Sequence, residues 1–281
     1  SHNSIIFHNL HATIDDKMDM IGFIGMGNMG TAMLKGAKRT FDGSQIIFHR
    51  KSVDKMKKLA EEEKVNYAMS NSEVVEKSKY IILAIKPQMF EKVIDEINDS
   101  LDNDKVIISL APGFTIAQLK EKLKAGRIVR SMPNTPAMIG EGMTGVCFDE
   151  NEFDENEIDV INKIFEATGK AKKVDEKLMN SVVCASGSSP AYVFMFIEAL
   201  ADSAVKCGLP RKDAYEFVAQ TVLGSAKLML ETGKHPGELK DMVCSPGGTT
   251  IAGVAELEKN GFRKAIFEAT DACFNKCNNI K

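Results

Sequence analysis

The sequence predicts an α/β protein with an amino-terminal, doubly wound parallel sheet and a carboxyl-terminal domain built of helices alone. Apolar runs of strand length alternate with helical stretches from Met20 to about residue 130, an order typical of a parallel sheet. A glycine-rich turn follows the first of these runs. From Lys177 onward, helical spacing replaces the strand-length runs, which indicates a change of architecture.

Composition sets broader limits. The chain has 281 residues, 44% of them hydrophobic and 27% charged, with a formal net charge of −3, so it is long enough for two domains. The absence of a basic run with interleaved aromatics argues against a nucleic-acid partner. Apolar stretches are interrupted before the roughly 20 residues that a membrane span needs. We expect a leader or cloning remnant at 1–19, a dinucleotide-binding domain at 20–176 and a helical substrate-binding and dimerisation domain at 177–281.

The first predicted strand, Met20–Ile24, runs directly into a turn with GxGxxG spacing at residues 25–30. Gly25 permits the tight turn, Gly27 lets the backbone reach a pyrophosphate, and Gly30 lets the next helix pack closely on the strand. Strand, glycine turn and helix in this order predict a Rossmann-type cofactor site. The expected contacts are Ile24, Gly25, Met26, Gly27, Asn28, Met29 and Gly30.

The second predicted strand, residues 45–48, ends in His49-Arg50-Lys51-Ser52. An NAD site usually has an acid about 20 residues beyond the glycine turn, to bind the ribose 2′-hydroxyl. Here the residues are basic, and Arg and Lys suit a 2′-phosphate. We therefore predict NADPH, with NADH possible, bound by His49, Arg50 and Lys51. A solvated basic turn is the alternative, but it leaves the missing acid unexplained.

Further alternation predicts helices at 53–62, after Asn71, at 90–97 and at 115–123, and strands at 65–69, 80–84, 106–109 and 127–130. Ligands of such sheets bind at the carboxyl ends of the strands. The alternative for each of these positions is ordinary turn chemistry. The cofactor-lining residues expected there are Asn71, Ala84, Ile85, Lys86, Pro87, Ser109 and Ala111.

In the helical part, Ser189 is the predicted N-cap of a helix that starts at Pro190 and runs to Gly208. Pro210 begins another. Both helices are apolar over more than one face. A dimer interface explains this excess, and a bundle buried within one subunit is the alternative.

Residues 245–250, Ser-Pro-Gly-Gly-Thr-Thr, directly precede a further predicted helix. Paired glycines let backbone amides approach a ligand, and the first helical turn adds unpaired N–H groups. This predicts a pocket for a small carboxylate. An ordinary loop with a Thr N-cap is the alternative.

The six cysteines are scattered without a CxxC pair, which suggests buried thiols in a reducing cytosol. We assign no metal and expect a cytoplasmic protein.

Several motifs together resemble the pyrroline-5-carboxylate reductase family over nearly all of residues 20–281. They are the glycine turn, Ala84–Pro87, Met132–Pro136, Ser186–Tyr192, and Leu239–Asp241 running into the 245–250 loop. The resemblance implies NAD(P)H-dependent reduction of the cyclic imine 1-pyrroline-5-carboxylate to L-proline, the last step of proline biosynthesis. It also implies a homodimer that assembles into a larger ring.

The resemblance further implies that Ser245, Gly248, Thr249 and Thr250 hold the substrate carboxylate and ring nitrogen. The Thr250 hydroxyl lies closest to the nitrogen and is the expected catalytic group. Glu176 matches an acidic family position near the substrate. Lys86 is a competing candidate beside the nicotinamide. The chain departs from the family pattern at Ser189 and Met242.

Two rival functions remain at this point. A β-hydroxyacid dehydrogenase shares the architecture, but it needs a lysine after a glycine-rich stretch of the second domain, and residues 186–192 contain none. A non-catalytic NADPH-sensing regulator does not need the carboxylate pocket.

Overall fold

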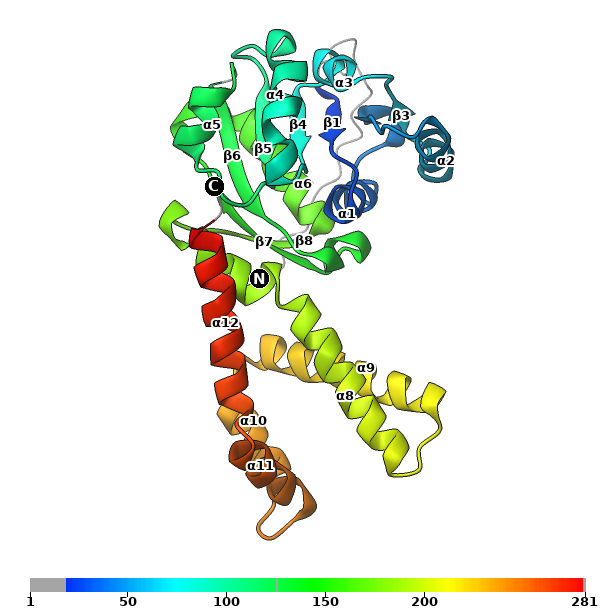
Figure 1. Ribbon diagram of the computed structural model, residues 1–281, viewed down its shortest axis with the longest axis vertical. Helices are drawn as coiled ribbons and strands as arrows, with labels where there is room; N and C mark the ends of the chain where they lie inside the picture. The colour runs from blue at the N-terminus through cyan, green and yellow to red at the C-terminus, as the bar shows by residue number, and fades with distance from the viewer. Residues whose placement is uncertain (1–18, 125, 280–281) are drawn as a thin grey trace, which may run out of the picture. The chain divides into compact units, whose positions relative to one another are not determined.

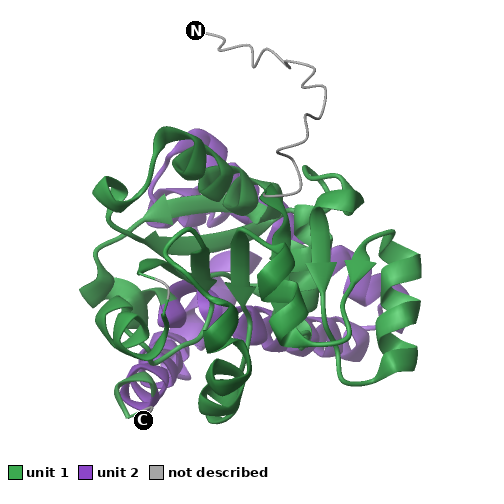
Figure 2. Ribbon diagram, turned by 90° about the horizontal axis from the view of Figure 1, so that it is seen from above, with its two compact units in different colours: residues 1–182, 277–281 green, residues 183–276 purple. Residues whose placement is uncertain are grey.

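The computed structural model describes residues 19–124 and 126–279. The leader or remnant expected at 1–19 therefore lies outside the described residues, apart from Asp19. Contacts divide the chain into two compact units, residues 1–182 with 277–281 and residues 183–276 (Figure 2). We describe each unit by itself.

The first unit contains one sheet, whose strand order in the described part of the chain is β3-β2-β1-β4-β5-β6-β7-β8 (Figure 1). Strands β1 to β6 pair in parallel, β7 is antiparallel to β6, and β8 is parallel to β7. The strand order reverses between β1 and β4, which is where such sheets bind ligands. The strands are β1 Ile21–Ile24, β2 Ile46–Phe48, β3 Asn66–Tyr67, β4 Tyr80–Leu83, β5 Val106–Ser109, β6 Arg127–Met132, β7 Gly142–Cys147 and β8 Gly169–Lys173.

Helices cover both faces of this sheet, which is why its central strands are apolar without interruption. Alternate strand residues such as Phe23 and Ile82 pack with α1, α2 and α6, whereas Ile81 and Leu83 pack with α3, α4 and α5. The helices are α1 Asn28–Ala37, α2 Val53–Glu63, α3 Asn71–Lys77, α4 Phe90–Ile97, α5 Ile116–Lys122 and α6 Glu155–Thr168.

The predicted doubly wound sheet is confirmed, with differences at its edges. The strand expected at 65–69 is only Asn66–Tyr67, both exposed, because Met69 donates its N–H to Glu73 Oε2 (3.1 Å) instead of continuing the strand. The sequence did not lead us to β7, β8 and α6. β7 contains two glycines, and β8 is largely lysine and exposed, so neither has the apolar pattern of a buried strand.

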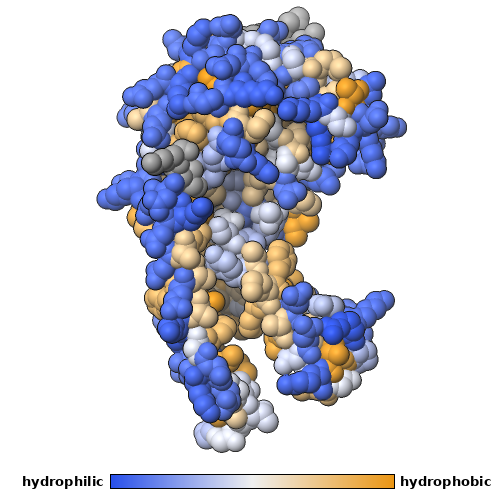
Figure 3. All heavy atoms as spheres, in the orientation of Figure 1, coloured by the Kyte–Doolittle hydropathy of each residue, from blue (hydrophilic) through white to orange (hydrophobic). Residues whose placement is uncertain are grey.

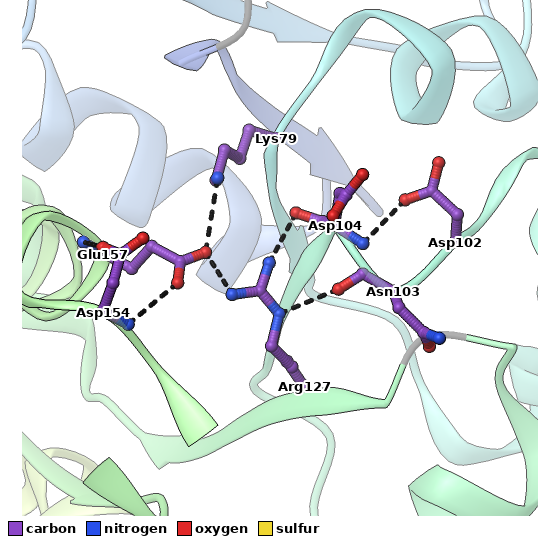
Figure 4. A network of polar contacts seen from close by, with 7 residues as sticks. All are labelled: Lys79, Asp102, Asn103, Asp104, Arg127, Asp154 and Glu157. Carbon is purple, nitrogen blue, oxygen red and sulfur yellow. Dashed lines mark hydrogen bonds and ion pairs between the residues drawn. The ribbon is translucent and has the colours of Figure 1, made fainter. Parts of the chain in front are cut away.

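A network of hydrogen bonds and ion pairs lies at the amino ends of the strands (Figure 4). Glu157 of α6 is buried, with its side chain 3% exposed, and it pairs with Arg127 and, at 3.3 Å, with Lys79 Nζ. Arg127 also donates to the carbonyls of Asn103 (2.9 Å) and Asp104 (2.7 Å). Burial opposes ionisation of Glu157, but the hydrogen bonds from Arg127 and from the Asp154 N–H outweigh it and lower its pKa. The network thus holds α6 to β6 and to the loop before β5.

The second unit is helical. Its elements are the π-helical turn Val183–Gly187, α8 Pro190–Lys206, α9 Arg211–Thr232, α10 Pro236–Val243, α11 Thr249–Lys259 and most of α12 Phe262–Asn278. Ser189 is the N-cap residue of α8 and Pro190 is its first residue, as predicted. The Ser189 side chain does not cap the helix, however, because its hydroxyl donates to the Ala185 carbonyl (2.7 Å) in the π-helical turn.

The second unit buries few side chains of its own. Its buried apolar cluster is Ala201, Ala214 and Val218, while large side chains such as Phe194, Phe217 and Leu230 are 63%, 66% and 67% exposed. Apolar side chains are accordingly exposed on the surface of these helices (Figure 3). The alternative of a bundle buried within one subunit is therefore wrong, and an apolar surface of this extent indicates a protein interface.

Two further expectations from the sequence differ from the structure. None of the six cysteines is fully buried in the chain, and Cys207 is exposed. One run, Glu176–Lys206, is long and apolar enough by length and composition to cross a membrane, although the sequence analysis found no such run. The difference arises because helical turns at residues 176–187 precede the helix predicted from Pro190. Such a run is equally compatible with a subunit interface, so it is weak evidence for a membrane.

We expect Arg127→Met to lower the free energy of unfolding by about 3–5 kcal/mol, because it leaves the buried Glu157 carboxylate without its main partner. Urea denaturation at a fixed protein concentration measures this loss. Arg263→Met, which removes an ion pair with Glu258 on the exposed surface, is the control and should lower the free energy of unfolding far less.

The pH dependence of the free energy of unfolding gives a second test of the Arg127–Glu157 pair. Because the folded pKa of Glu157 lies below 4.5, its contribution is present above that pH and is lost as the pH falls through the folded value. Arg127→Met should flatten this acid limb, and an unchanged limb would contradict the assignment.

We expect Phe217→Asp to reduce the molecular mass of the particle in solution, because a carboxylate at this position has to be desolvated when the apolar surface is covered. Light scattering after size exclusion measures the mass. Gln220→Asp places the same charge at an exposed polar position of α9 and should leave the mass unchanged. Identical masses for all three proteins would show that this surface is not an interface.

Candidate active site

The glycine turn lies between β1 and α1, at the point where the strand order reverses. Gly25 has φ +89°, and a Cβ on it would lie 2.3 Å from the Ala84 carbonyl oxygen at the end of β4. A Cβ on Gly30 would lie 2.0 Å from the Gly25 oxygen. These two residues must be glycine because the turn, α1 and β4 approach one another closely.

Gly27 differs from its neighbours because a Cβ on it would meet no atom within 4 Å. It is the N-cap of α1, and no side chain caps this helix. In contrast, α2, α3, α5 and α6 begin at Ser52, Ser70, Thr115 and Asp154, whose side chains accept a backbone N–H. The first turn of α1 therefore keeps unpaired N–H groups and an open approach, which is the arrangement that binds a phosphate.

Basic residues follow β2 at the same edge of the sheet. The ring of His49 donates through Nδ1 to the Ala68 carbonyl (2.9 Å), and Ser52 caps α2 by accepting from the Lys55 N–H (3.4 Å). Within residues 19–124 and 126–279, the side chains of Arg50 and Lys51 make no hydrogen bond or ion pair. Two cations without partners are thus available at the end of β2.

The turns after β4 and β5 contribute mainly backbone. Ala84 donates its N–H to Ile24 (2.8 Å), which joins the two turns. Ser109 is fully buried, and its hydroxyl accepts from the Ala111 N–H (3.2 Å). Lys86 is exposed and directly precedes Pro87, the first residue of a 3₁₀ turn. The Ser109 hydroxyl is therefore used in a hydrogen bond within its own turn, whereas the Lys86 side chain extends toward solvent.

Asn71, the first residue of α3, donates through Nδ2 to Glu96 Oε2 of α4 (2.9 Å). This contact holds the amide in one orientation at the edge where the cofactor residues lie. The positions of Asn71, Ile85, Lys86, Ser109 and Ala111 as cofactor ligands stay predictions.

In the second unit, residues 245–248 form the expected turn between α10 and α11, and residues 249–250 begin α11. Gly247 has φ +68°, and Gly248, not a threonine, is the N-cap of α11 without a side-chain cap. The alternative of a Thr N-cap is therefore wrong. Thr249 and Thr250 are the first two helical residues, and the Gly248 N–H bonds the Ser245 carbonyl (3.1 Å).

This turn has the properties of a carboxylate site. The hydroxyls of Ser245, Thr249 and Thr250 make no hydrogen bond to any residue that the structure describes. A Cβ on Gly248 would lie 2.5 Å from the Ser245 hydroxyl oxygen, so this hydroxyl lies over the start of α11. No acid stands in the first turn of the helix. Free N–H groups, free hydroxyls and the positive end of the helix dipole together favour an anion.

Glu176 lies in the first unit. Its Oε2 accepts from the Ile116 N–H (2.9 Å) at the start of α5 and pairs with Arg130 Nη1 (3.4 Å). Arg130 is buried, with its side chain 8% exposed, so it depends on this carboxylate. Glu176 Oε1 makes no such bond within the described residues. One carboxylate oxygen is structural, and the other remains available.

Two further chemistries are not indicated. Burial, together with the charge of Glu176, raises the pKa of the Cys147 thiol, so Cys147 is not an activated nucleophile. Within residues 19–124 and 126–279 no group of three potential metal ligands occurs.

A cavity of about 970 Å³ lies elsewhere, at the amino ends of the strands, where Met20, Lys79, Asp104 and Lys105 line it. We favour the carboxyl edge as the reaction site, because the glycine turn and the free cations lie there and because ligands of doubly wound sheets bind at that edge.

Comparison with known proteins agrees with these features. Residues 20–113 match a family model described as NADP oxidoreductase, coenzyme F420-dependent, and residues 176–280 match one described as pyrroline-5-carboxylate reductase dimerisation. The pyrroline-5-carboxylate reductase of Escherichia coli K12 is 49% identical over 91% of this chain and 96% of its own length. That of Arabidopsis thaliana is 41% identical over 90% of this chain and 92% of its own length. The crystal structure of the Plasmodium falciparum enzyme with NADP bound superposes with a TM-score of 0.84 at 32% identity, covering 94% of this chain and 98% of that one. On this evidence the chain belongs to the pyrroline-5-carboxylate reductase family.

Proposed function

We propose that the chain reduces the C=N bond of 1-pyrroline-5-carboxylate to give L-proline, the last step of proline biosynthesis, with NADPH as the electron donor. The main support for this proposal is that the chain belongs to this family and that two of its helices, α1 and α11, have glycine at the N-cap. One is followed along the chain by unpartnered cations, and the other is lined by unpartnered hydroxyls. The first suits a dinucleotide phosphate and the second a small carboxylate.

The residues present fit NADPH. The open face of Gly27 and the uncapped start of α1 suit the pyrophosphate. Arg50 and Lys51 suit the 2′-phosphate, because Arg binds phosphate through two parallel hydrogen bonds and Lys adds charge. When bound, the nicotinamide supplies the hydride that the imine carbon receives.

For the substrate, we assign its carboxylate to the N–H groups of Thr249 and Thr250 and to the Ser245 hydroxyl. Gly248 keeps this approach open because it has no side chain. An imine nitrogen is far more basic than a carbonyl oxygen, which favours binding of the substrate in its protonated form. The Thr250 hydroxyl then orients the protonated ring nitrogen, whereas for a substrate bound in its neutral form it relays a proton to the nitrogen through water. The remaining task of the protein is positioning and electrostatic stabilisation.

Glu176 Oε1 is a second candidate contact for the substrate, since Oε2 is occupied by the Ile116 N–H and Arg130. Its negative charge favours the protonated imine. Lys86 would disfavour this cation, so we place it beside the cofactor and not at the substrate nitrogen.

Three broader proposals accompany this function. The family match supports a dimer, and we propose that dimers group into a larger ring, which light scattering of the wild-type protein tests. We propose a cytoplasmic location because all six cysteines are free thiols, and cell fractionation tests it. We also keep a domain boundary near residue 176, which limited proteolysis tests.

The direct test of the function is NADPH oxidation, followed by absorbance, on addition of 1-pyrroline-5-carboxylate, with L-proline identified as the product. Oxidation of 3-hydroxy acids by NADP⁺ in place of this reaction would favour a β-hydroxyacid dehydrogenase. NADPH binding without any turnover would favour a regulator.

We expect Thr250→Ala to lower kcat/KM for the imine by about 100-fold, the usual effect of removing one hydrogen-bonding group from a reacting centre. Thr250→Ser keeps the hydroxyl and should retain most of the activity. Thr221→Ala removes a hydroxyl that bonds the Phe217 carbonyl within α9 and controls for a general effect of losing a threonine. Full kcat/KM in Thr250→Ala would remove this residue from the mechanism.

We expect the double variant Arg50→Ala with Lys51→Ala to weaken NADPH by about 10- to 100-fold in steady-state kinetics, because two charged contacts to phosphate are lost. NADH should be almost unaffected, since it lacks the 2′-phosphate. Lys57→Ala with Lys58→Ala removes the same charge from exposed positions of α2 and serves as the control. Equal losses for both cofactors would show that these cations do not bind the phosphate.

A further inference from the structure

His49 occupies a distinctive position in the cofactor site. It directly follows β2, where dinucleotide-binding proteins usually place the acid that binds the ribose 2′-hydroxyl. Its Nδ1 lies 2.9 Å from the Ala68 carbonyl oxygen. Since a carbonyl only accepts, Nδ1 carries a proton, and Nε2 is the ring nitrogen left to gain or lose one.

The backbone of β2 and the residues after β3 hold this ring in place. Ala68 donates its backbone N–H to the Phe48 carbonyl (2.8 Å), and its own carbonyl accepts the hydrogen bond from the His49 ring Nδ1–H. The next residue, Met69, donates its N–H to Glu73 Oε2 (3.1 Å). The imidazole is therefore anchored to a braced segment and is not a freely rotating surface side chain.

Charges of both signs surround His49. Arg50 and Lys51 follow it in the same turn and disfavour a further positive charge there. Glu73 of α3 favours one, although Lys77 holds its other oxygen at 2.8 Å. The pKa of Glu73 is lowered by the hydrogen bond from Lys77 and by that from the Met69 N–H, so Glu73 is ionised at neutral pH. A phosphate dianion bound in this turn would stabilise the protonated imidazole, because the two charges are opposite.

We propose that His49 is a third ligand of the 2′-phosphate of NADPH and binds it as the imidazolium, so that NADPH binding takes up a proton that NADH binding does not. The inference rests on the proposed use of NADPH. A phosphate dianion offers only acceptors, so neutral Nε2, also an acceptor, gives no bond to it. Protonated Nε2 donates a charge-assisted hydrogen bond. Histidine changes its charge between pH 5 and 8, so the effect falls in the physiological range.

The matched variant is His49→Asn. Asn retains an N–H that can bond the Ala68 carbonyl but has no second nitrogen to protonate. Isothermal titration of the full-length protein with NADPH and with NADH, at pH 6.5, 7.5 and 8.5, gives each Kd. Repeating the pH 7.5 titration in two buffers with different ionisation enthalpies gives the number of protons taken up.

For the wild-type protein we expect the Kd of NADPH to rise with pH, because the ring loses its proton. At pH 6.5, His49→Asn should bind NADPH about 10-fold more weakly than the wild type, the size of one hydrogen bond to a charged group. At pH 8.5 the two should converge. NADH should show neither effect. The 2′-phosphate itself titrates near pH 6, but both proteins share that contribution, so their difference isolates the ring.

Equal pH dependence and equal proton uptake in the wild type and His49→Asn would overturn the inference. If the variant does not fold, the wild-type proton count at pH 7.5 decides alone, because the 2′-phosphate, which titrates near pH 6, is then almost fully ionised. A count no higher with NADPH than with NADH would also overturn it. Failure of the proposed function looks different, as NADPH would then fail to bind or be oxidised at any pH.

Discussion

In the function that we propose, the chemistry of this protein depends on backbone N–H groups left unpaired at the starts of α1 and α11. Both helices have glycine at the N-cap, Gly27 and Gly248, and neither has a side-chain cap. A serine or aspartate there would stabilise the helix by roughly 1 kcal/mol, but it would occupy the groups that an anion needs. The first unit shows the contrast directly, since α2, α3, α5 and α6 are all capped by side chains. α4, α8 and α9 also lack a side-chain cap, but their N-cap residues are Met89, Ser189 and Pro210, so α1 and α11 differ from them by the glycine that leaves the helix start open.

The remaining architecture of the first unit holds α1 and the sheet in place. Gly25 and Gly30 let α1 approach β1 and β4 so closely that any side chain would collide with backbone. The Arg127–Glu157 network ties α6 to the opposite edge of the sheet. The second unit, in contrast, does not complete its own apolar packing, which agrees with the dimerisation model matched over residues 176–280. Assembly therefore supplies stability that the isolated helices lack.

Much of the fold was predictable because its elements follow local rules. Residues 90–97 and 106–109 have the expected periodicity and form α4 and β5 with the predicted bounds. β7 and β8 were not predictable, since glycine and lysine dominate them and their pairing is fixed by contacts distant in sequence. Ser189 stands at the predicted N-cap position of α8, but its hydroxyl bonds the Ala185 carbonyl of the preceding π-helical turn, a contact that the local cap signal did not show. In the site, the glycines and the basic turn were visible in the sequence. The binding of Glu176 to Ile116 and Arg130, across 60 and 46 residues, was visible only in three dimensions.

A crystal structure of the protein with NADPH and L-proline tests the central claim most directly. The account predicts the pyrophosphate on the N–H groups that follow Gly27 and the proline carboxylate on the N–H groups of Thr249 and Thr250, with distances of about 2.7–3.2 Å. A carboxylate bound away from the start of α11, or a pyrophosphate bound away from Gly27, would contradict it.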